Sequence, residues 1–112
     1  MCRELIEIQK KLLEMTEKAY SIGMCDKLGE PSIYVGIGND MKWFAEIYSY
    51  MLELSDSGRH HYFHADSFEE LIKKIWNAIE RAEKILHQYE LEKVIKENLK
   101  LLGEKDGMAK MV

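Results

Sequence analysis

Three of the four histidines lie within five positions of the chain, in the segment from Arg59 to His64. Imidazole nitrogens are common metal ligands, so a metal site is the first chemistry to consider. On a strand, however, His60 and His64 share a face but lie about 13 Å apart at roughly 3.3 Å per residue. Zinc needs its ligand nitrogens about 2.0 to 2.1 Å from one ion. Neither Cys2 nor Cys25 lies at ligand spacing from this segment, so we predict no metal ion and no other cofactor.

The same segment has the composition of a binding surface. An alternating strand would place His60, Tyr62 and His64 on one surface, and His61, Phe63 and Ala65 on the other. Imidazoles, a phenol and the nearby Arg59 are suited to stacking against a ring and to hydrogen-bonding its polar edge. An exposed polar sheet face without a ligand is the alternative interpretation, and the sequence does not indicate which surface is exposed.

A second candidate is the run from Gly36 to Asp40, between a predicted strand and a predicted helix. The unpaired amides and dipole of a helix N-terminus attract phosphate or carboxylate groups, and glycines let a ligand approach the backbone. The run lacks the third glycine of a dinucleotide fingerprint and the lysine of a P-loop, and Asp40 would repel an anion. A plain polar turn is therefore the alternative.

Taken together, these two segments predict one site for a small anionic or nucleotide-like ligand. Its residues are Gly36, Gly38, Asn39, Arg59, His60, Tyr62 and His64.

Arg59 and His64 are separated by four residues, and this spacing resembles the Arg-x4-6-His motif of the HEPN ribonucleases. The resemblance covers six residues. It implies RNA cleavage by Arg59 and His64 at a dimer interface of an all-helical bundle. The chain departs from that pattern because His60 replaces the usual polar residue after the arginine, and because IYVGIG and HHYFHA are typical of strands.

The order of segments from Gly36 to Phe68 is similar to that of small immunity-type proteins that neutralise bacterial toxins. It comprises GND, a predicted helix with KWFAEIYSYMLEL and a His-rich predicted strand. This resemblance implies a small protein that binds a protein target, and it assigns no site residues.

The elements that must position these residues follow from the spacing of apolar side chains. Residues 2–22 carry a heptad seam that predicts a helix ending near Gly23. Period-two alternation predicts a strand over 32–37, with Ile33, Val35 and Ile37 on one face and Ser32, Tyr34 and Gly36 on the other. Two apolar rows predict a helix over 41–54. The segment 59–65 predicts a second strand. We therefore expect an α+β fold in the order helix, strand, helix, strand, long helix, with a small two-stranded sheet.

The last predicted helix begins at Ser67, which forms a capping-box pattern with Glu70, and continues to Leu102. An unbroken helix of this length would be about 54 Å long, whereas a domain of this size has a radius of gyration near 13 Å. Either the helix breaks between Gln88 and Glu90, or its second half packs against another subunit. We favour a homo-oligomer whose interface contains Leu5, Leu12, Trp43, Tyr50, Leu91, Ile95, Leu99 and Leu102. Residues 1–103 would form one domain, and residues 104–112 a disordered tail.

The composition limits the classes of function. The chain has 112 residues, and its 16 Lys and Arg against 20 Asp and Glu leave a net charge of -4, which disfavours binding to duplex nucleic acid. No apolar run reaches the roughly 18 residues of a membrane span, and two cysteines fit a reducing, cytoplasmic location. The leading prediction is a non-enzymatic, homo-oligomeric protein that senses or sequesters a small ligand. A protein inhibitor of the immunity or antitoxin type and a HEPN-like ribonuclease are the alternatives.

Overall fold

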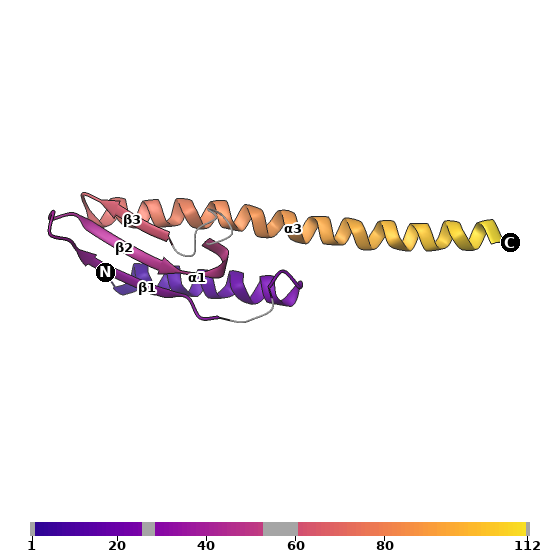
Figure 1. Cartoon of the computed structure of the whole chain (residues 1–112), viewed down its shortest axis with the longest axis horizontal. Coiled ribbons are helices and arrows are strands. Elements are labelled where there is room, and N and C mark those ends of the chain that lie inside the picture. Colours follow the sequence, from indigo (N-terminus) through magenta and orange to yellow (C-terminus); the bar gives the residue numbers. More distant parts are fainter. Residues whose placement is uncertain (1, 26–28, 53–60, 112) are drawn as a thin grey trace.

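The computed structural model describes residues 2–25, 29–52 and 61–111, with side chains up to Lys100 except those of Cys2 and His61. Its elements are α1 (Cys2–Ser21), β1 (Ser32–Ile37), β2 (Trp43–Tyr48), β3 (His61–Ala65) and α3 (Phe68–Met111). Residues 50–52 are also helical. The strands form an antiparallel sheet in the order β1-β2-β3. Both helices lie on one face of this sheet, as Figure 1 shows. The α+β class is therefore confirmed, while the sheet has three strands rather than two.

The predicted helix over 41–54 is wrong for most of its length, because residues 43–48 form β2. A hairpin with the loop Asn39-Asp40-Met41 joins β1 to β2. Two backbone hydrogen bonds close this loop. The Gly38 amide donates to the Lys42 carbonyl at 2.9 Å, and the Met41 amide donates to the Gly38 carbonyl at 3.0 Å. Met41 has a φ of 63°, the left-handed conformation that follows the turn in three-residue hairpin loops. Glycine usually occupies this position of such loops. Because methionine stands there instead, the sequence did not indicate a hairpin.

The core lies between the sheet and the two helices. The seam of α1 and one face of α3 are buried as their spacing predicts, and both meet the inward side chains of β2 and β3. The fully or almost fully buried apolar residues are Ile8, Leu12, Met15, Ala19, Ala45, Ile47, Met51, Leu52, Ala65, Leu71, Ile75, Ala78, Ile79, Ala82 and Leu86. Because α1 and α3 run side by side in the same direction (Figure 1), Lys11 pairs with Glu83 and Lys18 pairs with Glu90 seven residues further along both helices.

The predicted helix boundaries are confirmed by their capping contacts. Gly23 has a φ of 79° and ends α1 in a Schellman motif, in which the Met24 amide donates to the Ala19 carbonyl at 2.8 Å. At the start of α3, the Ser67 hydroxyl oxygen accepts a hydrogen bond from the Glu70 amide at 3.2 Å.

α3 is continuous over 44 residues, so the break between Gln88 and Glu90, which was the alternative to packing against another subunit, is not found. The helix is about 66 Å long at 1.5 Å per residue, and the molecule measures 74 × 23 × 21 Å with a radius of gyration of 19.2 Å. Figure 1 shows that the second half of α3 extends beyond α1 and the sheet. The helix assignment includes residues 104–111, and the disorder expected of 104–112 stays a prediction. Within the described part of the chain, no helix is apolar enough over sufficient length to cross a bilayer.

The residues predicted to join subunits fall into two groups. Leu12 is fully buried within its own chain and is therefore not available to a partner. Leu5 is half-buried, and Trp43 and Tyr50 pack partly buried against the core. The other group lies on α3, where Leu91, Ile95 and Leu99 are exposed. The side chain of Leu102 lies outside the described residues.

Candidate functional site

The face of the sheet that the helices leave open carries an aromatic surface. Residues directly opposite one another in neighbouring strands point to the same face. The pairing therefore forms one row of Gly36, Phe44 and His64 and a second row of Tyr34, Glu46 and Tyr62. Tyr48 lies opposite Ser32 in a third row. We call the following set the aromatic face: Tyr34, Phe44, Glu46, Tyr48, Tyr62 and His64.

The rings of the aromatic face contact one another and remain accessible. Tyr62 stacks with Phe44 at a centroid distance of 5.9 Å and an interplanar angle of 15°. The His64 ring lies on another side of Tyr62, with a centroid distance of 4.5 Å and an interplanar angle of 66°. Tyr34 and Tyr48 meet edge to face at 6.3 Å. The exposed fractions are 60% for Tyr34, 47% for Tyr62 and 41% for Tyr48, so a ligand could reach these rings without a conformational change.

The aromatic face has one carboxylate near its centre. Glu46 is half-buried, and its Oε2 accepts a hydrogen bond from the Tyr48 hydroxyl at 3.3 Å. The charge of Glu46 raises the pKa of Tyr48 because a phenolate beside a carboxylate is disfavoured. None of the six residues is lysine or arginine, so Glu46 makes this face attractive to hydrogen-bond donors and unattractive to anions.

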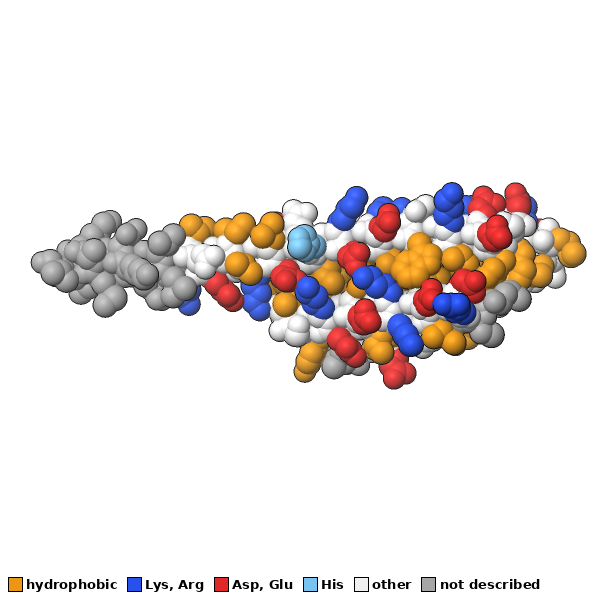
Figure 2. Space-filling view, turned by 180° about the vertical axis from the view of Figure 1, so that it is seen from behind, with side chains coloured by type: hydrophobic (Ala, Val, Ile, Leu, Met, Phe, Trp, Pro, Cys, Tyr) orange, Lys and Arg blue, Asp and Glu red, His pale blue; other side chains and the backbone are white. Residues whose placement is uncertain are grey.

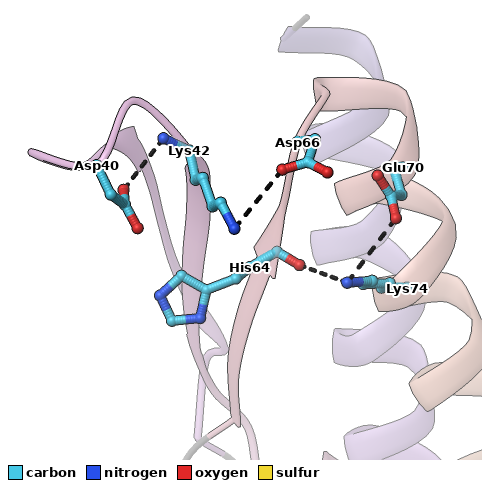
Figure 3. A network of polar contacts seen from close by, with 6 residues as sticks. All are labelled: Asp40, Lys42, His64, Asp66, Glu70 and Lys74. Carbon is cyan, nitrogen blue, oxygen red and sulfur yellow. Dashed lines mark hydrogen bonds and ion pairs between the residues drawn. The ribbon is translucent and has the colours of Figure 1, made fainter.

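Polar contacts fix the end of the sheet nearest the β1-β2 hairpin (Figure 3). The Asp40 carboxylate accepts a hydrogen bond from the Lys42 amide at 3.1 Å, and the Lys42 ammonium lies 3.8 Å from Asp66. On the helical side, Lys74 donates to the His64 carbonyl at 2.7 Å. Figure 3 shows the His64 ring on the opposite side of β3 from Lys74. The network therefore ties β3 to α3 through its backbone and leaves the imidazole on the aromatic face.

The structure brings together three of the seven residues predicted to bind a ligand. Gly36, Tyr62 and His64 lie on one face of the sheet. Gly38 and Asn39 lie in the hairpin turn at its end. Arg59 and His60 lie outside the described residues. Because β2 follows the turn, the helix N-terminus that was expected to attract an anion is absent from this position.

The HEPN resemblance implies an all-helical bundle, and this implication is wrong. His64 lies on β3 of an antiparallel sheet and not in a helical bundle. Arg59, its proposed catalytic partner, is outside the described residues.

Four residues of the aromatic face escaped the sequence prediction of a site, namely Tyr34, Phe44, Glu46 and Tyr48. The alternation of β1 correctly placed Tyr34 on the same strand face as Gly36. This shared face was the one signal in the sequence that could have added Tyr34 to the predicted site. The other three lie on β2 and would have been found only by recognising the hairpin.

The described residues contain no group of three His, Cys, Asp or Glu side chains placed to hold a metal ion. In comparisons with known proteins, no family model, no curated protein and no solved structure matches this chain. The function must therefore be inferred from the residues themselves.

Proposed function

We propose that this chain is a non-enzymatic binding protein that holds a flat, nitrogen-rich ring of the nucleobase type on its aromatic face. The proposal rests on one observation: Tyr62, Phe44 and His64 present neighbouring rings on the open side of the sheet.

Stacking supplies the affinity in this proposal. A base that stacks on an exposed aromatic side chain gains about 1 to 3 kcal/mol. Tyr62 is the central platform, because it contacts both neighbouring rings and is 47% exposed. Those contacts hold its ring in place before a ligand arrives, which lowers the entropy lost on binding.

Glu46 supplies the selectivity. A carboxylate accepts hydrogen bonds from ring N–H and amino groups, and a charged acceptor strengthens such bonds. The same charge repels phosphate. We therefore expect a base or nucleoside to bind more tightly than the corresponding nucleotide. This proposal departs from the small anionic or nucleotide-like ligand predicted from the sequence, because Glu46 disfavours an anion.

The proposal is tested by titrating the isotope-labelled chain with purine and pyrimidine nucleosides and their monophosphates, followed by NMR. We expect the signals of Tyr62, His64 and Phe44 to shift. Tyr62→Ala should weaken binding roughly 5- to 150-fold, the equivalent of one lost stacking contact. Tyr20 on α1 is also 47% exposed, so Tyr20→Ala is the matched control and should bind normally.

Glu46→Gln tests whether the carboxylate both accepts hydrogen bonds from the ring and repels phosphate. It should reduce nucleoside affinity and raise the relative affinity for a monophosphate. If none of these compounds shifts the aromatic signals, or if Tyr20→Ala weakens binding as much as Tyr62→Ala, the aromatic face does not bind such rings.

The second candidate is a protein partner, as in an inhibitor of the immunity or antitoxin type. It is supported by the exposure of three tyrosines around one carboxylate, because tyrosine is enriched at the centres of protein interfaces. An arginine of the partner could stack on Tyr62 and pair with Glu46. Stoichiometric capture of one host protein, lost in Tyr62→Ala and retained in Tyr20→Ala, would favour this candidate. A cytoplasmic location stays a prediction under both proposals.

A further inference from the structure

The outer edge of β1 carries backbone groups that point away from the rest of the sheet. In an antiparallel pair, successive residues direct their N–H and C=O groups alternately toward the partner strand and away from it. The Gly38 amide donates to the Lys42 carbonyl, so Gly38 and every second residue before it bond to β2. Ile33, Val35 and Ile37 therefore direct their N–H and C=O groups to the outer edge. Among residues 2–25, 29–52 and 61–111, β1 pairs with no strand other than β2.

The two edges of the sheet differ in their protection against a further strand. By the same alternation, His64 directs its carbonyl to the outer edge of β3, and Lys74 of α3 donates to that carbonyl at 2.7 Å (Figure 3). A lysine at an edge strand hinders the addition of another strand. At the other edge, no residue from Pro31 to Asn39 is charged, and the nearest charged residues along the chain are Glu30 and Asp40. The edge at β1 therefore lacks the charges that protect edge strands.

Exposed apolar side chains accompany the edge of β1. Ile37 points to the same face as Ile33 and Val35, which pack against the core, yet it is 54% exposed. On α1, Ile6 is 50% exposed. It lies one turn before Gln9, which donates to the carbonyl of the residue preceding β1 at 3.5 Å. Figure 2 shows hydrophobic side chains between charged ones along the margin of the domain that lies opposite α3, and β1 lies at this margin in Figure 1.

We infer that β1 pairs antiparallel with β1 of a second copy of the chain, with the twofold axis at Val35, to give one continuous sheet. In this register all three outward residues have partners, because Val35 faces Val35 and Ile33 faces Ile37 of the second copy. Each such pair exchanges two hydrogen bonds, about six in all. A shift by two residues would leave Ile33 or Ile37 opposite a residue outside β1. The paired register is self-complementary, as a twofold interface requires.

The side chains fit the same register. Ile37, which is exposed in a single copy, lies beside Ile33 of the second copy. On the open face, Tyr34 lies opposite Gly36 of the second copy, and glycine leaves room for the ring. The Phe44 ring lies against Gly36 within its own copy, so each Tyr34 extends the row of rings of the other copy. A second copy therefore satisfies both the backbone groups and the exposed apolar side chains of this edge.

The first test is sedimentation equilibrium of the full chain without ligand, for which we expect a dimer. Ile37→Lys should raise its dissociation constant at least about a hundredfold, because two isoleucines leave the interface and two charges enter it. Ile37→Pro should also weaken the dimer, since it removes an outward N–H and retains the hydrogen bonds to β2. Leu99→Lys is the matched control, because Leu99 is 61% exposed on the projecting part of α3, and it should leave the dimer intact.

Circular dichroism would verify that each variant folds. A monomer at the highest soluble concentration would overturn the inference. So would a folded Ile37→Lys variant that dimerises as tightly as the unmodified chain, or a dimer that Leu99→Lys disrupts instead.

The second test measures the orientation of the two strands. Ser32 is exposed at the start of β1. A spin label on Ser32→Cys, in a chain that also carries Cys2→Ser and Cys25→Ser, should give about 20 Å between copies, the length of six strand residues. A parallel pair in register would bring the two labels within about 10 Å, and that result would refute the antiparallel arrangement.

Discussion

The ring of Phe44 lies against the backbone of Gly36, such that a Cβ atom on Gly36 would be 3.0 Å from both Cε1 and Cζ of the ring. Glycine therefore leaves the space that lets Phe44 lie flat enough to stack on Tyr62. We expect Gly36→Ala to tilt the Phe44 ring and to lower the free energy of unfolding by about 1 kcal/mol. Chemical denaturation and the NMR signals of Tyr62 would measure the two effects.

The control for this prediction uses a double variant. Once Phe44→Ala has removed the ring, Gly36→Ala should increase the free energy of unfolding by about 0.5 to 1 kcal/mol, because alanine suits a strand better than glycine. If Gly36→Ala changes the free energy of unfolding equally with and without the Phe44 ring, contact with that ring is not the reason for glycine at position 36.

Met41 occupies a backbone conformation that glycine adopts more readily, since its φ is 63°. We expect Met41→Gly to raise the free energy of unfolding by about 1 kcal/mol by relieving this strain. Met41→Val should lower it, because β-branched side chains fit the left-handed region poorly. The Met41 side chain is 81% exposed, so Met41→Ala should be nearly neutral. Thermal unfolding would rank the three variants, and an alanine variant as stable as the glycine variant would contradict the prediction.

Lys93 stabilises the end of α1 by donating to the Ile22 carbonyl at 2.7 Å. A cation at a helix C-terminus interacts favourably with the helix dipole and satisfies a carbonyl that has no partner within the helix. Lys93→Met retains helix propensity and should cost about 1 kcal/mol of stability. Lys73→Met, at an exposed position of α3 within the domain, serves as the comparison. Equal melting temperatures for the two variants would show that the contact contributes nothing measurable.

Tyr48 should ionise at a higher pH than an ordinary tyrosine, since Glu46 raises its pKa. The folded chain therefore retains the phenol proton more strongly than the unfolded chain does. The stabilisation from this effect is fully present below the ordinary pKa of about 10 and is lost as the pH rises through the folded value. NMR titration of the tyrosine rings would detect the shift, and Glu46→Gln should bring the Tyr48 midpoint down; an unchanged Tyr48 midpoint in this variant would contradict the assignment of the shift to Glu46.

The parts of the fold that follow local rules could be predicted from the sequence. Apolar spacing identified α1, and capping residues at Gly23 and Ser67 marked helix ends that the structure confirms. Alternation identified β1, with Ile33 and Val35 packed against the core and Tyr34 on the open face, while Ile37 at the end of the strand is 54% exposed and not buried with them. The same reasoning placed Tyr62 and His64 on one side of β3.

The rest could not be predicted because β2 does not look like a strand. Its inward residues Trp43, Ala45 and Ile47 and its outward residues Phe44 and Tyr48 are all apolar or aromatic, so no polar alternation appears. The same apolar residues also fit two rows of a helix, which tertiary pairing overrides. Since β2 is the central strand, this one error removed half of the aromatic face from the predicted site.

The two helices cover only one face of the sheet, so the six side chains of the aromatic face are all carried by paired strands and none by a loop. The spacing between these side chains is therefore set by the hydrogen-bonded register of the strands. A ligand that binds there meets a surface that is already in place, and the entropy lost on binding comes mainly from the ligand.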